Sequence, residues 1–198
     1  MANSVLLFKN NYKNADELVK ALRFPVFVKP NNGGSSIGMS KVNSPSEDLD
    51  TAIQKAFKED DQVLVEEFIK GREFTISVFK SNNKIIPLPI TEIITKKDFF
   101  DYEAKYLGAS EEITPADIDT SISQRITDEA IKIYQIFNCS GVVRIDFIYK
   151  EAEGEPYMLE INTVPGQTEA SLVPQQVKVM GWTLKEFYTA LLRECLPA

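Results

Sequence analysis

Two short segments of this sequence place charged and amide side chains at the spacing of a β-strand. The segments are Arg144-Ile145-Asp146-Phe147 and Leu159-Glu160-Ile161-Asn162. Because successive side chains point to opposite faces of a strand, Arg144 and Asp146 share one face. By the same rule Glu160 and Asn162 share one face, and Leu159 is expected on the opposite, apolar face.

Residues 150–155 separate the two segments and are strongly polar, which is typical of a turn. The two segments are therefore predicted to form a β-hairpin. A hairpin centred near Ala152 or Glu153 places Asp146 directly across from Glu160.

The same hairpin places Arg144 near Asn162. The carboxylates of Asp146 and Glu160 then face each other, and they repel unless a positive charge compensates them. Together with the Asn162 amide they offer the hard oxygen ligands of Mg²⁺, which retains waters and favours substrate phosphates. The alternative is a solvated polar face on which Arg144 bridges the two acids; the sequence favours the metal site.

A glycine- and serine-rich stretch over residues 28–38 lies between two expected strands. Glycines let the backbone approach a ligand closely. Consecutive N–H groups and the Ser35 and Ser36 hydroxyls can surround phosphate oxygens, and Lys29 adds a positive charge. This is not a Walker loop, because no Gly-Lys-Ser/Thr follows and the next element is a strand. The alternative is an ordinary hairpin loop, but with the metal site the stretch predicts metal-assisted phosphoryl transfer.

The composition excludes several other kinds of chemistry. The chain has 198 residues and no histidine, which removes Ser-His-Asp and Cys-His catalysis and most zinc sites. A net charge of −7 makes it a poor general binder of nucleic acid, and no apolar run is long enough to cross a bilayer. We expect Cys139 and Cys195 to be free thiols. We see no signal peptide and therefore expect a cytoplasmic protein without a membrane partner.

The rest of the pattern divides into short strands and amphipathic helices. Besides the hairpin, we expect strands over residues 24–29, 39–42, 62–66, 73–79, 84–88 and 90–94, with a turn at Asn82-Asn83. We expect helices over residues 15–22, 45–57, 118–137, 171–180 and 183–196, with capping boxes at Asn14, Ser44 and Thr183. Residues 95–115 form a long polar connection. This mixture predicts an α+β fold with antiparallel sheets, a small lobe over 25–68 and a large lobe over 69–198.

The chain contains, in this order, VKPNNGGSSIGMSKV, VEEFIKGREFT, DYEAKY, RIDF and LEINTVPGQTEASLVP. This series resembles the signatures of the D-alanine–D-alanine ligases of the ATP-grasp superfamily, from about Phe24 to the C-terminus. The resemblance implies an ATP-grasp fold, in which two α+β lobes with largely antiparallel sheets enclose the nucleotide. It also implies ATP-dependent joining of two D-alanines through an acyl phosphate, a step of peptidoglycan precursor synthesis.

The resemblance assigns contacts with ATP to matching positions. Lys29 and Lys105 are expected to touch the phosphates, and Ser35 and Ser36 to lie in the loop that closes over them. Further nucleotide contacts are expected from Glu66, Glu67, Phe68, Ile69, Glu73, Phe99 and Leu159. An ordinary packed aromatic is an equally good interpretation of Phe99. The metal, Mg²⁺ or in its place Mn²⁺, is expected on Asp146, Glu160 and Asn162.

The resemblance also assigns the chemical step. Arg144 and the backbone N–H of Gly166 are expected to stabilise the oxyanion of the tetrahedral intermediate, although the loop around Gly166 could be only a turn. Ser35 is expected among the catalytic residues. Tyr106 is expected to approach the second substrate, and a tyrosine here goes with D-alanine rather than D-lactate. The end of the substrate is expected to lie against Ser171 and Leu172.

Some features of the family have no counterpart in this chain. Family members carry an N-terminal domain ahead of this region, and residues 1–24 correspond only to the tail of the central segment. We therefore expect a fragment that binds ATP weakly and makes little dipeptide, and a homodimer for the full-length protein. Glu67 stands where some relatives have a cation beside the adenine. Two alternatives remain open: another carboxylate–amine ligase, and a noncatalytic nucleotide-binding fragment.

Overall fold

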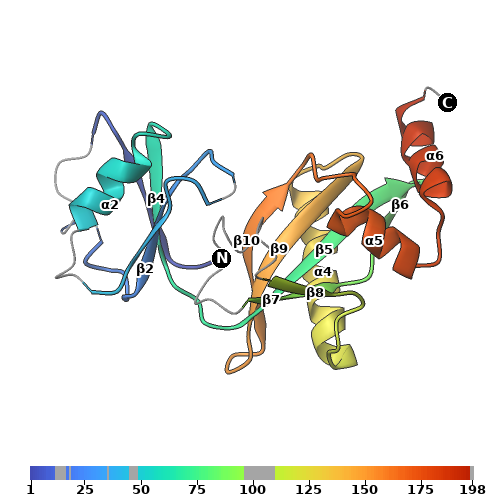
Figure 1. Ribbon diagram of the computed structural model, residues 1–198, viewed down its shortest axis with the longest axis horizontal. Helices are drawn as coiled ribbons and strands as arrows, with labels where there is room; N and C mark the ends of the chain where they lie inside the picture. Colours follow the sequence, from blue (N-terminus) through green and yellow to red (C-terminus); the bar gives the residue numbers. More distant parts are fainter. Residues whose placement is uncertain (12–16, 18, 35, 45–48, 96–109, 197–198) are drawn as a thin grey trace. The chain divides into compact units, whose positions relative to one another are not determined.

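The computed structural model describes residues 1–11, 17, 19–34, 36–44, 49–95 and 110–196. The chain divides into two compact units (Figure 1). The first unit contains the described residues up to Ile69, and the second contains residues 70–94 and those from Glu111 onward. The lobe boundaries expected from the sequence, at residues 24 and 68, stay a prediction.

The first unit is a four-stranded antiparallel sheet with one helix. Its elements are β1 (Ser4–Phe8), β2 (Val26–Pro30), β3 (Ser40–Val42), α2 (Leu49–Ala56) and β4 (Gln62–Glu67), and the strand order is β1-β4-β2-β3. Burial alternates along β2 and β4, as expected when one face of a sheet packs on a core. The buried face carries Val26, Val28, Val63 and Val65, which join Ile53 and other α2 residues in one apolar cluster.

The second unit is built on a six-stranded sheet. Its strands are β5 (Arg72–Ser81), β6 (Lys84–Pro87), β7 (Thr91–Thr95), β8 (Ser110–Ile113), β9 (Val142–Lys150) and β10 (Glu155–Asn162). The order is β10-β9-β5-β7-β8, and β6 pairs with β5 beside this path. The helices are α4 (Thr120–Ile136), α5 (Leu172–Val179) and α6 (Leu184–Cys195).

Helices cover both faces of this sheet. Residues of α4 pack with Phe74, Ile76 and Ile145 on one face. Residues of α5 and α6 pack with Phe79 on the other face. None of the helices in the described part of the chain has the length and apolar character that a membrane span requires.

These observations confirm the predicted α+β class, since the pairings of β1–β4, β2–β3, β2–β4, β5–β6, β5–β7, β5–β9 and β9–β10 are all antiparallel. The Asn82-Asn83 turn is confirmed, with φ of 50° and 60°. The Thr183 capping box is also confirmed. Asn14 and Glu47, on which the two other predicted capping boxes depend, and residues 15, 16 and 18 of the helix expected over 15–22 lie outside the described residues. Strands β1 and β8 were not predicted.

Candidate functional site

The polar side chains of the second sheet lie in two adjacent rows that cross its strands. Direct pairing of residues gives the first row, which is Glu160 (β10), Asp146 (β9), Thr75 (β5) and Thr91 (β7). The second row is Asn162 (β10), Arg144 (β9) and Ser77 (β5). The predicted hairpin pairs, Asp146 with Glu160 and Arg144 with Asn162, are therefore confirmed.

A β-bulge at Leu159 produces this pairing. The hairpin starts with Lys150 paired to Glu155, but its register shifts by one residue between Met158 and Glu160. Without the shift, Leu159 would face Asp146. Bulges are frequent next to functional sites, where they redirect a side chain. The bulge also corrects the prediction that Leu159 lies on the apolar face, because Leu159 is 37% exposed.

Arg144 joins the two acids of the first row. Its Nε and Nη2 atoms donate to Oδ1 and Oδ2 of Asp146, both at 2.9 Å, and Nη2 lies 3.8 Å from Glu160 Oε1. The side chains of Arg144 and Asp146 are 18% and 14% exposed, against 50% for Glu160. Burial opposes the charge of Arg144, but hydrogen bonding to Asp146 and the negative charges of Asp146, Glu160 and Glu112 outweigh it and raise the guanidinium pKa. Arg144 therefore lies between the two acids, as in the alternative that the sequence left open beside the metal site.

The residues predicted to bind metal supply oxygen atoms of the kind that Mg²⁺ prefers. Asp146 Oδ1 also accepts a hydrogen bond of 2.5 Å from Thr75 Oγ1, and Asn162 Oδ1 accepts one of 3.1 Å from the Val164 amide. Among the described residues there is no group of three or more His, Cys, Asp and Glu that could hold a metal. Two carboxylates and an amide fit a Mg²⁺ whose remaining ligands are water and phosphate oxygens.

The loop after β10 brings together two further predicted residues. A Cβ added to Gly166 would lie 2.7 Å from Ser171 Oγ and 3.3 Å from Ser171 Cβ, so the absence of a side chain lets the loop lie close to Ser171. Ser171 is the N-cap of α5, but its hydroxyl lies 2.9 Å from Thr168 Oγ1 and does not cap the helix. Leu172 is the first residue of α5 and is half-buried. These contacts position Gly166 against the start of α5.

In the first unit, the predicted phosphate-binding lysine has an acidic partner. Lys29 Nζ on β2 donates to Glu66 Oε1 on β4 at 2.6 Å, and the side chains are 25% and 15% exposed. Nearby, the Phe68 ring packs edge-on against Phe27 and lies 4.5 Å below Lys41 Nζ. A basic group, an acidic group and an aromatic ring thus lie on one side of this sheet.

The glycine-rich loop is anchored at its beginning and end. The Asn32 amide donates to Asp60 Oδ2 at 2.6 Å, and the Asn31 amide donates to the Gln62 carbonyl at 2.9 Å. The hydrogen bond from Asn32 lowers the pKa of Asp60. Gly38 has a φ of +75°, and a Cβ there would lie 2.8 Å from a carbon of the Glu59 side chain. Ser36 has a positive φ of 57°.

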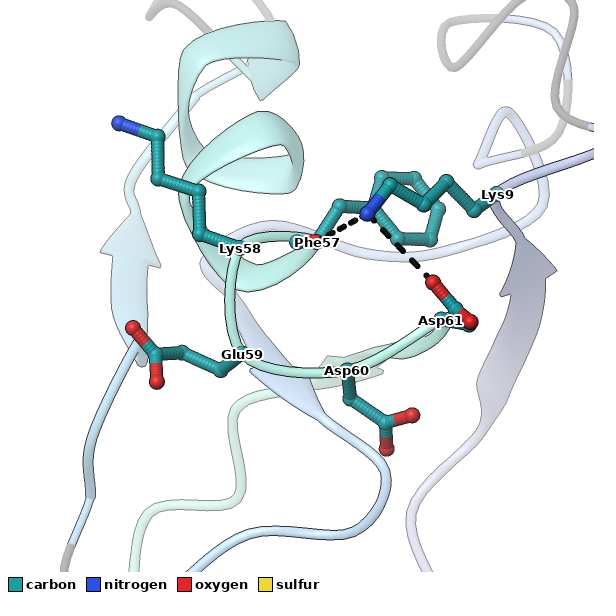
Figure 2. A pocket seen from close by; sticks show the side chains of 6 residues that line it. All are labelled: Lys9, Phe57, Lys58, Glu59, Asp60 and Asp61. Carbon is teal, nitrogen blue, oxygen red and sulfur yellow. Dashed lines mark hydrogen bonds and ion pairs between the residues drawn. The ribbon is translucent and has the colours of Figure 1, made fainter.

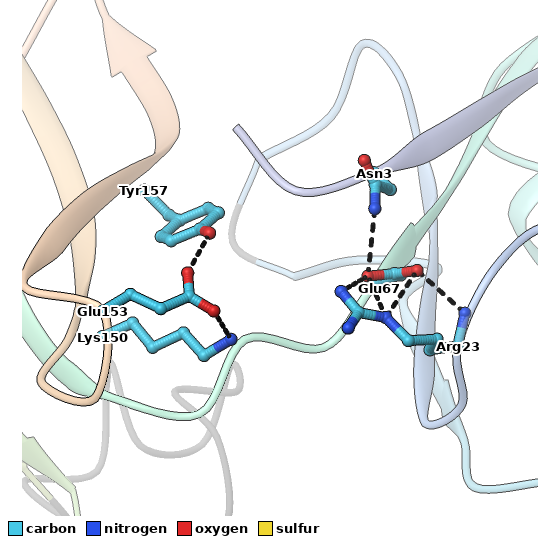
Figure 3. A network of polar contacts seen from close by, with 6 residues as sticks. All are labelled: Asn3, Arg23, Glu67, Lys150, Glu153 and Tyr157. Carbon is cyan, nitrogen blue, oxygen red and sulfur yellow. Dashed lines mark hydrogen bonds and ion pairs between the residues drawn. The ribbon is translucent and has the colours of Figure 1, made fainter.

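Glu67 lies at the end of β4 and is only 5% exposed (Figure 3). It accepts hydrogen bonds from the amide, Nε and Nη2 of Arg23 and from Asn3 Nδ2. The Arg23 side chain itself is 77% exposed. Hydrogen bonding from Arg23 outweighs burial and lowers the pKa of Glu67. Its carboxylate therefore acts as a buried anchor, a role that the sequence did not indicate.

Two other polar groups contain none of the predicted residues, although Asp60 of the second group also binds the glycine-rich loop. Figure 3 also shows Glu153, at the hairpin turn, between Lys150 and Tyr157. A pocket of about 280 Å³ is lined by Lys9, Phe57, Lys58, Glu59, Asp60 and Asp61. Figure 2 shows these six side chains. The first group closes the turn, and in the second Lys9 donates to the Phe57 carbonyl at 2.9 Å. None of their residues belongs to the predicted site.

The predicted residues thus fall into two groups. Lys29, Ser36, Glu66, Glu67, Phe68 and Ile69 belong to the first unit. Glu73, Arg144, Asp146, Leu159, Glu160, Asn162, Gly166, Ser171 and Leu172 belong to the second. Glu73 lies on β5 between Ile93 and Ile148 of the neighbouring strands. Ser35, Phe99, Lys105 and Tyr106 lie outside the described residues.

Comparison with known proteins places the chain beside ligases that use D-alanine. The family model described as "D-ala D-ala ligase C-terminus" matches residues 3–193. The D-alanine–D-alanine ligase of Flavobacterium johnsoniae is 46% identical over 188 residues, covering 95% of this chain and 57% of that protein. The enzyme of the same name from Parabacteroides distasonis is 43% identical, covering 98% of this chain and 58% of that protein. The chain therefore spans less than two thirds of these relatives.

Solved structures give the same result. The VanG D-Ala:D-Ser ligase from Enterococcus faecalis superposes with a TM-score of 0.86 at 36% identity, covering 96% of this chain and 55% of that one. The D-alanine–D-alanine ligase from Bacillus anthracis complexed with ATP superposes with a TM-score of 0.79 at 30% identity. That superposition covers 97% of this chain and 59% of the other.

Proposed function

Since this chain belongs to the family of D-alanine–D-alanine ligase C-termini, with an ATP-grasp fold, we propose that it is the ATP- and metal-binding catalytic region of such a ligase. The proposed reaction joins two D-alanines at the expense of ATP. The first carboxylate takes the γ-phosphoryl group, and the amine of the second amino acid displaces the phosphate. Phosphorylation turns a carboxylate oxygen into a good leaving group, which is why ATP is needed.

The observation that carries the proposal is the arrangement of Arg144, Asp146 and Glu160. Two carboxylates share the guanidinium of Arg144, which supplies one positive charge for two negative ones in a partly buried setting. A divalent cation bound to both acids would reduce the repulsion between them further. We assign Asp146, Glu160 and Asn162 to Mg²⁺, which would neutralise charge on the phosphates of bound ATP.

The chain's own residues account for the remaining tasks. Arg144 presents a planar cation, held in orientation by Asp146, to the oxyanion of the tetrahedral intermediate. The Gly166 amide is proposed as the second donor. In the first unit, Lys29 is proposed to bind ATP phosphates. Without nucleotide, Lys29 forms an ion pair with Glu66. When Lys29 binds the ATP phosphates instead, Glu66 is proposed to accept a hydrogen bond from the nucleotide.

Further residues of both units are proposed to contact the nucleotide or the substrate. Ser35, Ser36 and Lys105 are proposed to contact phosphates. Glu67, Phe68, Ile69, Glu73, Phe99 and Leu159 are proposed to line the nucleotide, with Glu67 acting through its backbone because its side chain binds Arg23. Ser171 and Leu172 are proposed to contact the substrate. The full-length protein is proposed to be a cytoplasmic homodimer in peptidoglycan precursor synthesis.

D-Serine is a second candidate for the amino acid that supplies the amine. The D-Ala:D-Ser ligase from Enterococcus faecalis is 36% identical to this chain over the superposed region. Relatives named D-alanine–D-alanine ligase reach 46% identity, and Tyr106 goes with D-alanine, so we propose D-alanine as the preferred amine. Identification of the product by mass spectrometry, with D-alanine offered alone and together with D-serine or D-lactate, separates these substrates.

The metal assignment is tested by substituting the most exposed carboxylate of the cluster. Glu160→Gln removes one negative charge and leaves the bond between Arg144 and Asp146 in place. We expect Mg²⁺-dependent binding of a nonhydrolysable ATP analogue to weaken at least about tenfold, a loss of about 1.4 kcal/mol. Thermal unfolding should change little, because Glu160 is half exposed. Unchanged nucleotide affinity with Mg²⁺ present would show that Glu160 is not a ligand.

A further inference from the structure

The inner half of the first polar row has no role in the proposed function. Thr75 and Thr91 continue the row of Glu160 and Asp146 into the interior, where they are 2% and 0% exposed. Burying a hydroxyl is costly unless it is hydrogen-bonded. These two threonines therefore require partners, and their partners connect the acidic cluster to helix α5.

Thr75 acts directly on Asp146. Its hydroxyl donates to Asp146 Oδ1 at 2.5 Å, and the two residues pair across β5 and β9. The same Oδ1 accepts from Arg144 Nε at 2.9 Å, and Oδ2 accepts from Arg144 Nη2. Hydrogen bonds to an ionised acceptor are short and strong, so two neighbours fix both the χ1 rotamer and the plane of this carboxylate.

Gln176 connects the row to helix α5. It is fully buried, and its Nε2 donates to the Thr75 carbonyl at 3.2 Å and to Thr91 Oγ1 at 3.1 Å. Thr91 Oγ1 lies 2.6 Å from Thr114 Oγ1. Within the described residues, Gln176 Oε1 has no hydrogen-bond partner, and burying an unpaired oxygen destabilises the fold. An apolar residue would avoid this cost, so the advantage of a glutamine here is its Nε2 donor.

We propose that Thr75 is a positioning residue for the Asp146 carboxylate and that Gln176 ties helix α5 to the same row. The consequence is that Asp146 and the start of α5, which holds Ser171 and Leu172, keep one fixed geometry. The proposal rests on the proposed function, in which Asp146 is a metal ligand. Partners that orient metal ligands typically change metal affinity about 10- to 100-fold when removed.

The test compares substitutions at two buried hydroxyls of strand β5. Thr75→Val removes the hydroxyl at nearly constant shape, and Thr75→Ser restores it. Ser77→Ala is the matched control, because Ser77 lies on the same face, is fully buried, and its Oγ has no partner among the described residues. Thermal unfolding of each variant establishes that it folds.

The first readout is the affinity for Mn²⁺ in the presence of a nonhydrolysable ATP analogue, measured by electron paramagnetic resonance of free Mn²⁺. We expect Thr75→Val to weaken binding about tenfold. Thr75→Ser and Ser77→Ala should stay within about twofold of the wild type. If Thr75→Val binds Mn²⁺ as tightly as the wild type, or no more weakly than Ser77→Ala, the proposal is wrong.

The second readout needs neither metal nor nucleotide. Three-bond couplings to the Asp146 carboxyl carbon report whether its χ1 angle occupies one rotamer. The wild type and Ser77→Ala should show one rotamer, and Thr75→Val an average of several. Should the wild type not bind Mn²⁺ with nucleotide, the metal assignment fails while this readout still decides the positioning role. A single Asp146 rotamer in Thr75→Val overturns it.

The role of Gln176 is tested separately by amide hydrogen exchange. Gln176→Met keeps the size and apolar packing of the side chain but removes both amide donor bonds. We expect faster exchange of the hydrogen-bonded amides of α5, from Gln175 to Met180, and unchanged exchange in α6. Equal protection of α5 in the variant and the wild type would overturn this part of the proposal.

Discussion

In the first unit, Glu66 and Glu67 each meet one basic side chain at the end of strand β4, whereas in the second unit Asp146 and Glu160 share Arg144 across two strands. The first arrangement gives each acid a basic partner of its own, and the second gives two acids one partner in common. Two acids that face each other across paired strands offer several oxygen atoms to one cation, which is the basis for placing the metal in the second unit.

The units also differ in how far polar groups enter the interior. The core of the first unit is an apolar cluster under one face of its sheet. In the second unit Thr75, Thr91 and Gln176 lie fully buried behind the acidic cluster. A polar interior is costly, but it holds charged groups in defined orientations. The second unit should therefore lose more stability when its charged cluster is broken.

The largest effect is expected from Asp146→Ala. The change leaves the buried Arg144 guanidinium without its bidentate partner and Thr75 Oγ1 without its acceptor. Removing one member of a buried ion pair costs roughly 3–5 kcal/mol, and we expect the low end because Glu160 still lies near Arg144. Urea unfolding measures the loss. A destabilisation no larger than that of an exposed charge removal, such as Glu169→Gln, contradicts the shared-guanidinium account.

A smaller effect is expected from Glu67→Gln in the first unit. A neutral amide accepts weaker hydrogen bonds from Arg23 and Asn3, so we expect a loss of about 1–3 kcal/mol at pH 7. The folded-state pKa of Glu67 is lowered, so its contribution is present above the ordinary pKa of 4.5 and is lost as the pH falls through the folded-state pKa.

The stability difference between wild type and Glu67→Gln should therefore shrink as the pH is lowered below 4.5. Urea unfolding of both proteins at about five pH values between pH 3 and pH 7 measures this difference in the free energy of unfolding. A difference independent of pH would mean that the Glu67 carboxylate is not held by Arg23 as a charged group.

The smallest effect is expected from Thr183→Ala, which tests a part of the second unit remote from its charges. The capping box joins Thr183 and Glu186 through both backbone and side-chain groups. Its loss should cost about 1 kcal/mol without changing nucleotide affinity. Thr189→Ala, within the same helix, should be neutral or stabilising. Altered nucleotide affinity in Thr183→Ala would show that helix α6 influences the site.

The sequence predicted the residue pairs of the β9–β10 hairpin correctly, but it did not predict the β-bulge that produces them. Alternation and a polar turn indicated that Asp146 faces Glu160, and one of the two proposed turn centres gives this register. The structure reaches it through a bulge at Leu159 instead. Nothing in the local sequence marks a bulge, because it is set by pairing with β9, and Leu159 was therefore assigned to the wrong face.

Long-range pairs account for what the sequence could not indicate. Arg23 and Glu67 are 44 residues apart, and no periodic pattern connects them. Gln176 lies among apolar residues of α5 and carries no signal of its partners on β5 and β7. Strand β1 has four consecutive apolar residues rather than an alternating pattern, because Leu6 and Phe8 remain exposed.

The central claim is that this chain holds ATP through a metal bound at the acidic cluster of the second unit. Calorimetric titration of the chain with a nonhydrolysable ATP analogue, with and without Mg²⁺, tests it most directly. We predict binding that depends on Mg²⁺ and is weakened at least about tenfold in Glu160→Gln. Equal binding with and without Mg²⁺, or no binding by a folded chain, would contradict the claim.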